Sequence, residues 1–401
     1  MDGFYQRPAE AVRVVPPRPA RDARLDIVRG LLQLSIFASH VTGSVVGGWF
    51  IHGAWGFSDS SEQFILLSGF TLGSVFARKQ ARDGWRGAAA DLLRRTWRLY
   101  RIHLLVFALF GVLMLAASLS FLPGEAAARG WRPLWNDPWH AVPGAALMLF
   151  QPDFMGILPA FVWCMLLLPG FAWLCGRFGD AALLAPVAVY AAVVCFGLML
   201  SPMPAGRGIS FNPFAWQVLY LVGAWLGGRA LRDGVALALP RRWDRGLTIA
   251  ALALVGGGLW VKLSWHGVVA LPAPDPITSM IDWKPDLAPL RALHALALAW
   301  LVARLVPRSA DWMDTAPGRW MARIGRHSLE VFCLGIFLSW GVATLLRLAP
   351  PMAGAVADVP LIVAGFLALG WFARRLERQR LVVGNGAAQP DCNVGHPSHK
   401  R

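Results

Sequence analysis

The chain has 401 residues, of which 56% are hydrophobic and 15% are charged, and its formal net charge is +15. Soluble domains carry about one quarter charged residues, and long apolar runs recur here from end to end, so the composition excludes an ordinary soluble enzyme and indicates a polytopic membrane protein. A nucleic-acid-binding protein would need a basic face on a soluble domain, which this sequence lacks, so we expect no nucleic-acid partner.

The apolar runs predict an all-α polytopic membrane protein with about ten transmembrane helices. We expect one integral-membrane domain over residues 25–380, between a disordered lead (1–24) and a disordered tail (381–401). No internal repeat is visible, which argues against an inverted-repeat transporter. The predicted spans are 31–50, 61–77, 103–122, 155–175, 181–201, 214–231, 246–264, 289–306, 327–347 and 355–373, with a shorter apolar stretch at 141–150.

The distribution of Lys and Arg predicts the orientation. With a cytoplasmic N-terminus, the segments on one side of the membrane hold 31 of the 38 basic residues. This asymmetry follows the positive-inside rule and places both termini in the cytoplasm, where the basic loops lie beside anionic lipid.

The first apolar run carries a polar stripe. On a helix, Asp26, Arg29, Gln33, His40 and Ser44 fall within about 60° of arc on one face. Arg29 and His40 are separated by about 16 Å of rise, roughly half of a 30 Å hydrocarbon core. Such a stripe needs polar neighbours or water, so we interpret it as functional; the alternative is one hydrogen bond from His40 to a backbone carbonyl.

Carboxylates precede the second run, in "HGAWGFSDSSEQF". Asp59 and Glu62 have no Lys or Arg nearby in the sequence, and they are candidates for orienting His40 or binding sugar hydroxyls. The alternative is that Ser58 or Asp59 caps the helix.

An arginine cluster, "LLRRTWRLYRIH", precedes the third run and includes Arg95 and Arg98. Arginine forks suit phosphate oxygens, so these side chains and Arg29 are candidates for binding phosphate groups. Anchoring of the loop to the membrane surface is the alternative for the cluster.

Two further segments supply candidates. Asn212 with the following proline predicts a helix start, while Trp216 and Gln217 have the chemistry to stack on and hydrogen-bond a sugar. Arg291 and His294 lie at the beginning of the eighth run, at the same level of the membrane as the residues above, and are candidate substrate-binding residues.

Glu330 lies within apolar sequence at the beginning of the ninth run. An intramembrane carboxylate is a functional candidate, and pairing with Arg326 is the alternative. In the tail, Cys392, His396 and His399 make too weak a set for a metal site, so we expect no metal. The other four cysteines lie in predicted spans, so we expect no disulfide framework; they are Cys164, Cys175, Cys195 and Cys333.

Several of these motifs together resemble one family. Arg29 and His40, with ten residues between them, resemble the Arg-X10-His signature of the acyltransferase-3 superfamily. The segments "RLDIVRG", "GFSDSSEQFILLSGF", "FNPFAWQ", "LRALHALALAW" and "GRHSLEVFCLGIFLS" resemble the OpgC family of bacterial glucan succinyltransferases. In "QPDFMGILPAFV", however, Gly156 and Phe161 stand where the resemblance implies an acidic residue and a tyrosine.

The resemblance implies a bacterial inner-membrane acyltransferase. It would move an acyl group, succinyl by resemblance, from a cytoplasmic acyl-CoA to a hydroxyl of a periplasmic glucan or another envelope glycan. Acyl-CoA would be a co-substrate, with no permanently bound cofactor. His40 is the expected general base, with Glu62 or Glu330 stabilising its imidazolium, since a hydroxyl nucleophile must lose its proton during attack. The other possibility is that His40 is itself acylated and forms an acyl-histidine intermediate. The alternative function is a transporter or flippase for a glycan or lipid-linked sugar.

Overall fold

The computed structural model describes residues 22–386, except 207, 235, 271–282 and 309. Within these ranges the protein is all helical and contains no strand, as predicted. Among the described residues, five segments are long and apolar enough to cross a membrane, namely Ser60–Ser120, Ile157–Phe196, Arg241–Trp265, Ser328–Leu348 and Pro351–Arg380. The membrane class is therefore confirmed at this level, while the count of about ten spans and the cytoplasmic termini stay predictions.

The chain divides into two compact units, and the single membrane domain expected over residues 25–380 stays a prediction. In the described chain, unit 1 is His52–Val306, and unit 2 combines Asp22–Ile51 with the residues from Pro307 onward. The main helices of unit 1 are α3 (Ser60–Ser120), α7 (Ile157–Phe178), α8 (Leu184–Phe196), α9 (Pro213–Asp233), α10 (Arg241–Trp265) and α12 (Pro289–Leu305), with short helices α4 (Glu125–Ala128), α5 (Pro133–Asn136) and α6 (Pro138–Ala146). Those of unit 2 are α1 (Ala23–Ser39), α2 (Val45–Trp49), α13 (Ala316–Arg326), α14 (Ser328–Leu348) and α15 (Pro351–Gly386).

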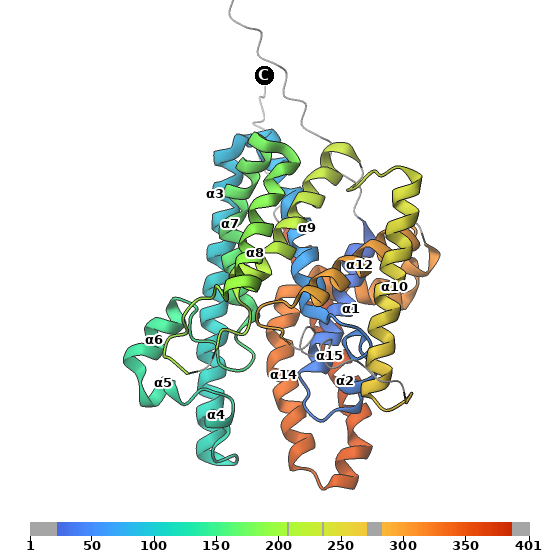
Figure 1. Cartoon of the computed structure of the whole chain (residues 1–401). Helices are drawn as coiled ribbons and strands as arrows, with labels where there is room; N and C mark the ends of the chain where they lie inside the picture. Colours follow the sequence, from blue (N-terminus) through green and yellow to red (C-terminus); the bar gives the residue numbers. More distant parts are fainter. Residues whose placement is uncertain (1–21, 207, 235, 271–282, 309, 387–401) are drawn as a thin grey trace, which may run out of the picture. The chain divides into compact units, whose positions relative to one another are not determined.

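In unit 1, α9 packs most extensively against α3, and α7 and α8 complete this group of helices (Figure 1). The α3–α9 contact is backbone against backbone, since a β-carbon at Gly69 or Gly73 would overlap the backbone of Tyr220 or Ala224. Small residues allow this close approach between membrane helices.

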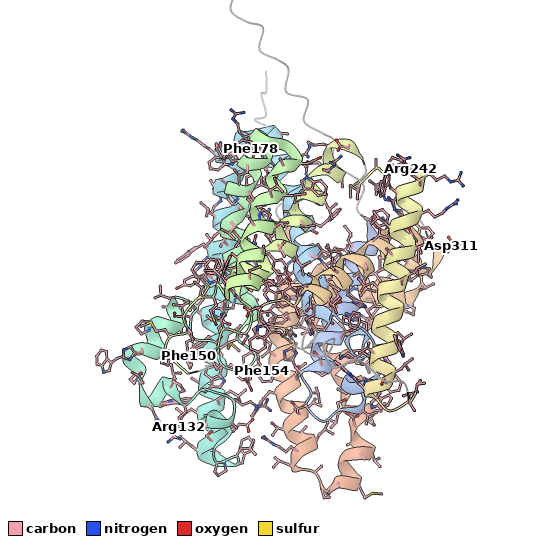
Figure 2. The ribbon with its side chains drawn as sticks, viewed as in Figure 1. Arg132, Phe150, Phe154, Phe178, Arg242 and Asp311 are labelled. Carbon is pink, nitrogen blue, oxygen red and sulfur yellow. The ribbon has the colours of Figure 1, made fainter. Side chains whose placement is uncertain are left out.

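The connection from α6 to α7 adds two rings to an aromatic cluster on the second half of α3. Phe110 lies 5.3 Å from the Phe154 ring, and Phe107 lies 5.9 Å from the Phe150 ring, between centroids. Phe150 and Phe154 belong to the connection from α6 to α7 (Figure 2). The apolar stretch 141–150 is therefore part short helix and part connection.

Helix α3 differs from the sequence prediction, because residues 78–102 were expected to form a loop between two spans. They are helical, apart from a break at Gly84, whose φ of 75° favours glycine. The physical reason is local: this segment is rich in Ala, Leu and Arg, which are strong helix formers, and Asp91 pairs with Arg95 at 2.8 Å and with Lys79, beyond the break, at 2.5 Å.

In unit 2, α1 packs mainly against α13, and α14 packs against α15 (Figure 1). A β-carbon at Gly30 would overlap the carbonyl of Met321, and one at Gly325 would overlap that of Asp26, so α1 and α13 touch through their backbones. The core joins α1, α13, α14 and α15 through Leu34, Phe37, Val41, Ile324, Val331, Ala343, Ile362, Leu369 and Ala373.

Helix α1 ends at Ser39, so the prediction of one continuous helix over 31–50 is wrong. Gly43, at φ 87°, turns the chain, and Ser44 caps the separate short helix α2 by accepting a bond from Gly47 N at 3.2 Å. The predicted polar stripe therefore ends at His40, the C-cap residue of α1, and does not include Ser44.

The predicted ends of the chain lie mostly outside the described residues. Where the structure does describe them, they are helical: α1 begins at Ala23, inside the predicted lead (1–24), and α15 continues through Gly386, inside the predicted tail (381–401). The helices therefore extend slightly beyond the predicted limits of the membrane domain, and the disorder of the remaining end residues stays a prediction. Cys392, His396 and His399 lie outside the described residues.

Candidate functional site

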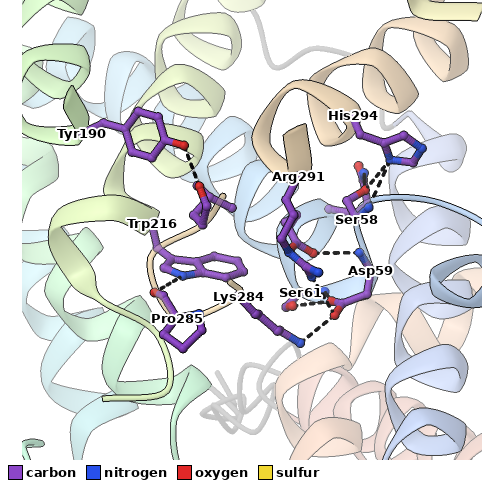
Figure 3. A network of polar contacts seen from close by, with 12 residues as sticks. Ser58, Asp59, Ser61, Tyr190, Trp216, Lys284, Pro285, Arg291 and His294 are labelled. Carbon is purple, nitrogen blue, oxygen red and sulfur yellow. Dashed lines mark hydrogen bonds and ion pairs between the residues drawn. The ribbon is translucent and has the colours of Figure 1, made fainter. Parts of the chain in front are cut away.

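A cluster of four charged side chains lies at the N-terminus of α3 in unit 1 (Figure 3). Arg291 donates to Glu62 Oε1 from Nε at 2.7 Å and to Asp59 Oδ2 from Nη2 at 3.0 Å. Lys284 Nζ donates to the same Asp59 oxygen at 2.6 Å. Two carboxylates thus balance two cations. We call Asp59, Glu62, Lys284 and Arg291 the charged cluster.

Local sequence fixes the two carboxylates of the charged cluster. Asp59 is the N-cap of α3 and accepts from Ser61 N at 2.8 Å, while Glu62 Oε2 accepts from Asp59 N at 2.9 Å. This is a reciprocal capping box. The helix-cap interpretation of Asp59 is therefore confirmed, and the cations missing from the nearby sequence come from Lys284 and Arg291, more than two hundred residues later.

Burial separates the cluster into an inner and an outer pair. The side chain of Glu62 is fully buried and that of Arg291 is 10% exposed, whereas those of Asp59 and Lys284 are 30% and 38% exposed. Both Glu62 oxygens have protein partners, so its observed role is to clamp α12 to α3. Burial alone would raise the pKa of Asp59, but Lys284 and Arg291 hold it well below its usual range. Asp59 and Lys284 form the outer, more exposed edge, which can reach a polar ligand.

Next to the charged cluster, Ser58 and His294 form a buried pair (Figure 3). Ser58 Oγ lies 2.7 Å from His294 Nδ1, and Ser58 N donates to the same nitrogen at 3.3 Å. Nδ1 therefore accepts, which places the proton of the neutral ring on Nε2. Gly56 lies against the ring, since a β-carbon there would meet Cε1 and Nε2. His294, 1% exposed, is a packed internal residue in this structure.

The segment that carries Lys284 is held by α8 and α9 (Figure 3). Asn212 N and Trp216 Nε1 both donate to Pro285 O, at 2.9 and 3.0 Å, and Tyr190 Oη donates to Leu287 O at 2.6 Å. These bonds fix the approach of Lys284 to the charged cluster.

The interpretation of Asn212, Trp216 and Gln217 as sugar-binding residues is not supported by their surroundings. All three are at most 2% exposed. Asn212 caps α9 through Phe214 N at 3.2 Å, which confirms the predicted helix start, and Gln217 Nε2 donates to Pro186 O at 2.8 Å. They are internal because amide and indole groups can also satisfy buried backbone carbonyls.

His40 belongs to unit 2 and ends α1. Its Nδ1 lies 2.7 Å from Ile36 O, and a carbonyl only accepts, so Nδ1 carries the proton of the neutral ring. The backbone bond anticipated as the simpler alternative is therefore present. It also fixes the tautomer in which Nε2 bears the lone pair, the arrangement a general base requires.

Asp358, on α15, was not identified from the sequence. Its Oδ2 accepts from Val45 N at 2.7 Å, and its side chain is 4% exposed. Asp358, Ile362 and Gly365 lie on one face of α15. A β-carbon at Gly365 would overlap the Phe37 ring. The residues on both sides of His40, Phe37 and Val45, are thus attached to the same face of α15.

Glu330 lies far from His40. It pairs with Arg380 at 3.3 Å. Arg380 is twenty-two residues, about 33 Å, along α15 from Asp358, whose partner Val45 is only five residues from His40. The expectation that Glu330 stabilises the His40 imidazolium is therefore wrong.

The predicted partner of Glu330 is wrong as well. Arg326 binds Glu377 at 2.6 Å, together with Arg323 at 2.5 Å. These arginines lie on α13, close to Arg29, because Gly325 touches the backbone of Asp26 and Gly30. The Arg29 end of α1 is thus rich in cations.

The arginines of α3 have mixed surroundings. Arg95 is engaged by Asp91 at 2.8 Å and is half exposed, and Arg98 is exposed on the same helix. Both belong to unit 1. The bond to Asp91 gives Arg95 a structural role in the helix, and neither side chain is brought to a defined binding site.

Sequence reasoning missed Lys284, Ser58 and Asp358 as partners. Only Asp358 carried a usable signal, since it is the one acidic residue in the apolar stretch 351–373. Lys284 is found only through folding. Among the described residues no group of His, Cys, Asp and Glu is arranged to hold a metal.

The fold and these sites define a helical membrane protein with buried charge in each of its two units. The family model for the OpgC protein matches residues 21–380, and the chain belongs to this family. Neither a curated protein nor a solved structure matches the chain. Family membership indicates a transferase that modifies glucans.

Proposed function

We propose that the protein is an inner-membrane O-acyltransferase that moves an acyl group, succinyl being the first candidate, from a cytoplasmic acyl-CoA to a hydroxyl of a periplasmic glucan. The observation that carries the proposal is the bond from His40 Nδ1 to Ile36 O, because it sets Nε2 as a proton acceptor on a helix that also bears Arg29. Membership of the OpgC family supports the same reaction class.

The reaction requires one proton acceptor. The glycan hydroxyl oxygen attacks the thioester carbonyl while His40 Nε2 takes the hydroxyl proton. The tetrahedral intermediate then collapses, the carbon–sulfur bond breaks, and the thiolate of coenzyme A leaves and takes that proton back. The products are an ester and free coenzyme A, and His40 returns to its initial tautomer.

Arg29 is the proposed donor-binding residue. A guanidinium forms paired hydrogen bonds to phosphate oxygens, and the neighbouring α13 adds Arg323 and Arg326. Their partner Glu377 balances only part of this charge.

The test is a purified-protein assay with succinyl-CoA and periplasmic glucan, reading free thiol and glycan mass. His40→Gln keeps hydrogen-bonding capacity but cannot accept a proton, so we expect a fall of about 10²–10⁴-fold in rate. His140→Gln is the control, since His140 is exposed on α6 and bonds only Asp137 in the same unit. Retention of most activity by His40→Gln would remove the base assignment.

The same preparation tests the alternative of a transporter. Protein in sealed vesicles that moves glycan without releasing thiol from acyl-CoA would exclude the acyltransferase. Thiol release and glycan modification in detergent, where no compartment exists, would exclude transport as the activity measured.

A further inference from the structure

Unit 1 contains a cavity of about 530 Å³ between α3, α7 and α9, away from the charged cluster. Its volume falls within the range of about 300–1,000 Å³ that is usual for ligand pockets. No residue of the proposed acyl-transfer chemistry lines it, so the cavity is a separate feature of the molecule.

The cavity is closed at one end and open at the other. Its inner wall is made of buried side chains, including Phe76, Leu168 and Phe171. Its open end lies where α7 and α9 finish, at Gly176 and Arg232, which are exposed. From Ala224 to Arg232 the cavity extends about 12 Å along α9. The shape is a blind slot that admits a chain from one end.

Polar groups occur only near the open end. Gln80 of α3 and Arg232 of α9 lie there, and neither side chain has a hydrogen bond or ion pair with another residue of the described chain. The deeper lining is aliphatic and aromatic. The slot therefore suits a molecule with a hydrocarbon chain and an anionic head beside Arg232.

This polarity argues against the pantetheine arm of an acyl-CoA. That arm carries two amides, and in the slot they would be buried without partners, at a cost of about 1–3 kcal/mol each. A hydrocarbon chain has no such cost. The opening is on the side where the sequence predicts the basic loops, which attract anionic lipid.

We propose that this slot binds one acyl chain of an anionic glycerophospholipid, whose phosphate lies against Arg232 and Gln80. The site is independent of the acyl-transfer reaction and binds the lipid as a structural ligand. Its effect is to fill the space between α3, α7 and α9 and hold their ends together.

The probe is a phosphatidylglycerol with a photoreactive group near the end of one acyl chain, added to the full-length protein in phosphatidylcholine nanodiscs. After irradiation, peptide mass spectrometry locates the label. We expect label on residues of the slot, and about fivefold less from the matched phosphatidylcholine probe, since one basic side chain contributes about that factor.

Two variants test the site from both ends. Arg232→Gln removes the charge and should lower phosphatidylglycerol labelling about fivefold, to the level of phosphatidylcholine. Gly228→Leu should remove most of the label, because the leucine side chain would occupy the slot. The added β-carbon meets only the flexible end of Arg232 and the β-carbon of Ala77. Gly170→Leu is the matched control on the exposed face of α7, where a β-carbon meets nothing within 4 Å.

Three outcomes would overturn the proposal. Absence of label in the slot would show that no lipid chain enters it. Equal labelling by both lipids, unchanged in Arg232→Gln, would remove the anionic head from the site. Displacement of the label by succinyl-CoA would assign the slot to the acyl donor.

Discussion

Arg291 binds Glu62 through two guanidinium nitrogens and so joins helices whose residues are 229 positions apart in the chain. Glu62 is fully buried, and the pair is completed by the capping bond from Asp59 N. A buried ion pair of this kind contributes little net stability, but loss of one member leaves an uncompensated charge.

Removing one member of this pair should destabilise unit 1 strongly. We expect Arg291→Leu to lower the free energy of unfolding by about 3–5 kcal/mol, measured by thermal or denaturant unfolding in detergent. The double variant Glu62→Leu with Arg291→Leu should recover part of this loss, since neither charge is then left alone. A double variant no more stable than Arg291→Leu would contradict the pairing.

The low pKa of Asp59 predicts how the stability of the protein changes at acidic pH. Because Lys284 and Arg291 hold its folded pKa well below the unfolded value of about 3.9, the ionised carboxylate stabilises the fold above that value. This stabilisation is lost as the pH falls below about 4 and through the folded pKa. Melting temperature measured against pH should therefore fall less steeply in Asp59→Asn than in the parent protein. Identical acid limbs would show that Asp59 does not contribute.

Arg29 should act on donor affinity. We expect Arg29→Ala to raise the KM for acyl-CoA more than Arg29→Lys, since lysine keeps the charge but loses the paired geometry. Steady-state kinetics with acyl-CoA as the varied substrate measures both. Arg98→Ala is the control for a general loss of positive charge, since Arg98 is an exposed residue of α3. An unchanged KM in both Arg29 variants would exclude phosphate binding there.

Asp358 should position the chain that follows His40. Asp358→Leu leaves the Val45 amide without its acceptor, at a cost of about 1–3 kcal/mol, and we expect kcat to fall while the KM for acyl-CoA stays constant. Asp358→Asn keeps an acceptor and should restore most of kcat. Thr344→Val is the control, since this buried hydroxyl has no partner among the described residues. A kcat that Asp358→Leu leaves intact would exclude the positioning role.

The sequence predicted the helical membrane class because hydrophobic runs report directly on burial in lipid. It also predicted the N-caps, since Asp59 and Asn212 act on amides two residues away. Pairs between residues far apart in the sequence were harder to predict. Arg291 was expected at the level of Asp59, and the structure brings them together, but Lys284 carried no sequence signal of its own.

The structure departs from the sequence predictions for two separate physical reasons. Polar side chains in apolar sequence were interpreted as sites, whereas Trp216 and Gln217 satisfy backbone carbonyls inside the protein. The predicted first helix was also too long, because hydrophobic periodicity does not detect the turn at Gly43 that follows the end of α1. Neither effect can be recovered from residue spacing alone.

The break at Gly84 has a consequence for how α3 meets the bilayer. An unbroken helix over Ser60–Ser120 would be about 92 Å long, three times the thickness of the hydrocarbon layer. The break divides it into one segment of about 36 Å, slightly longer than that layer, and one of about 54 Å, which is much longer. Residues 85–101 of the longer segment include five arginines, whose charge confines them to the headgroup region. We therefore expect the arginines of α3 to set the depth of unit 1 in the bilayer.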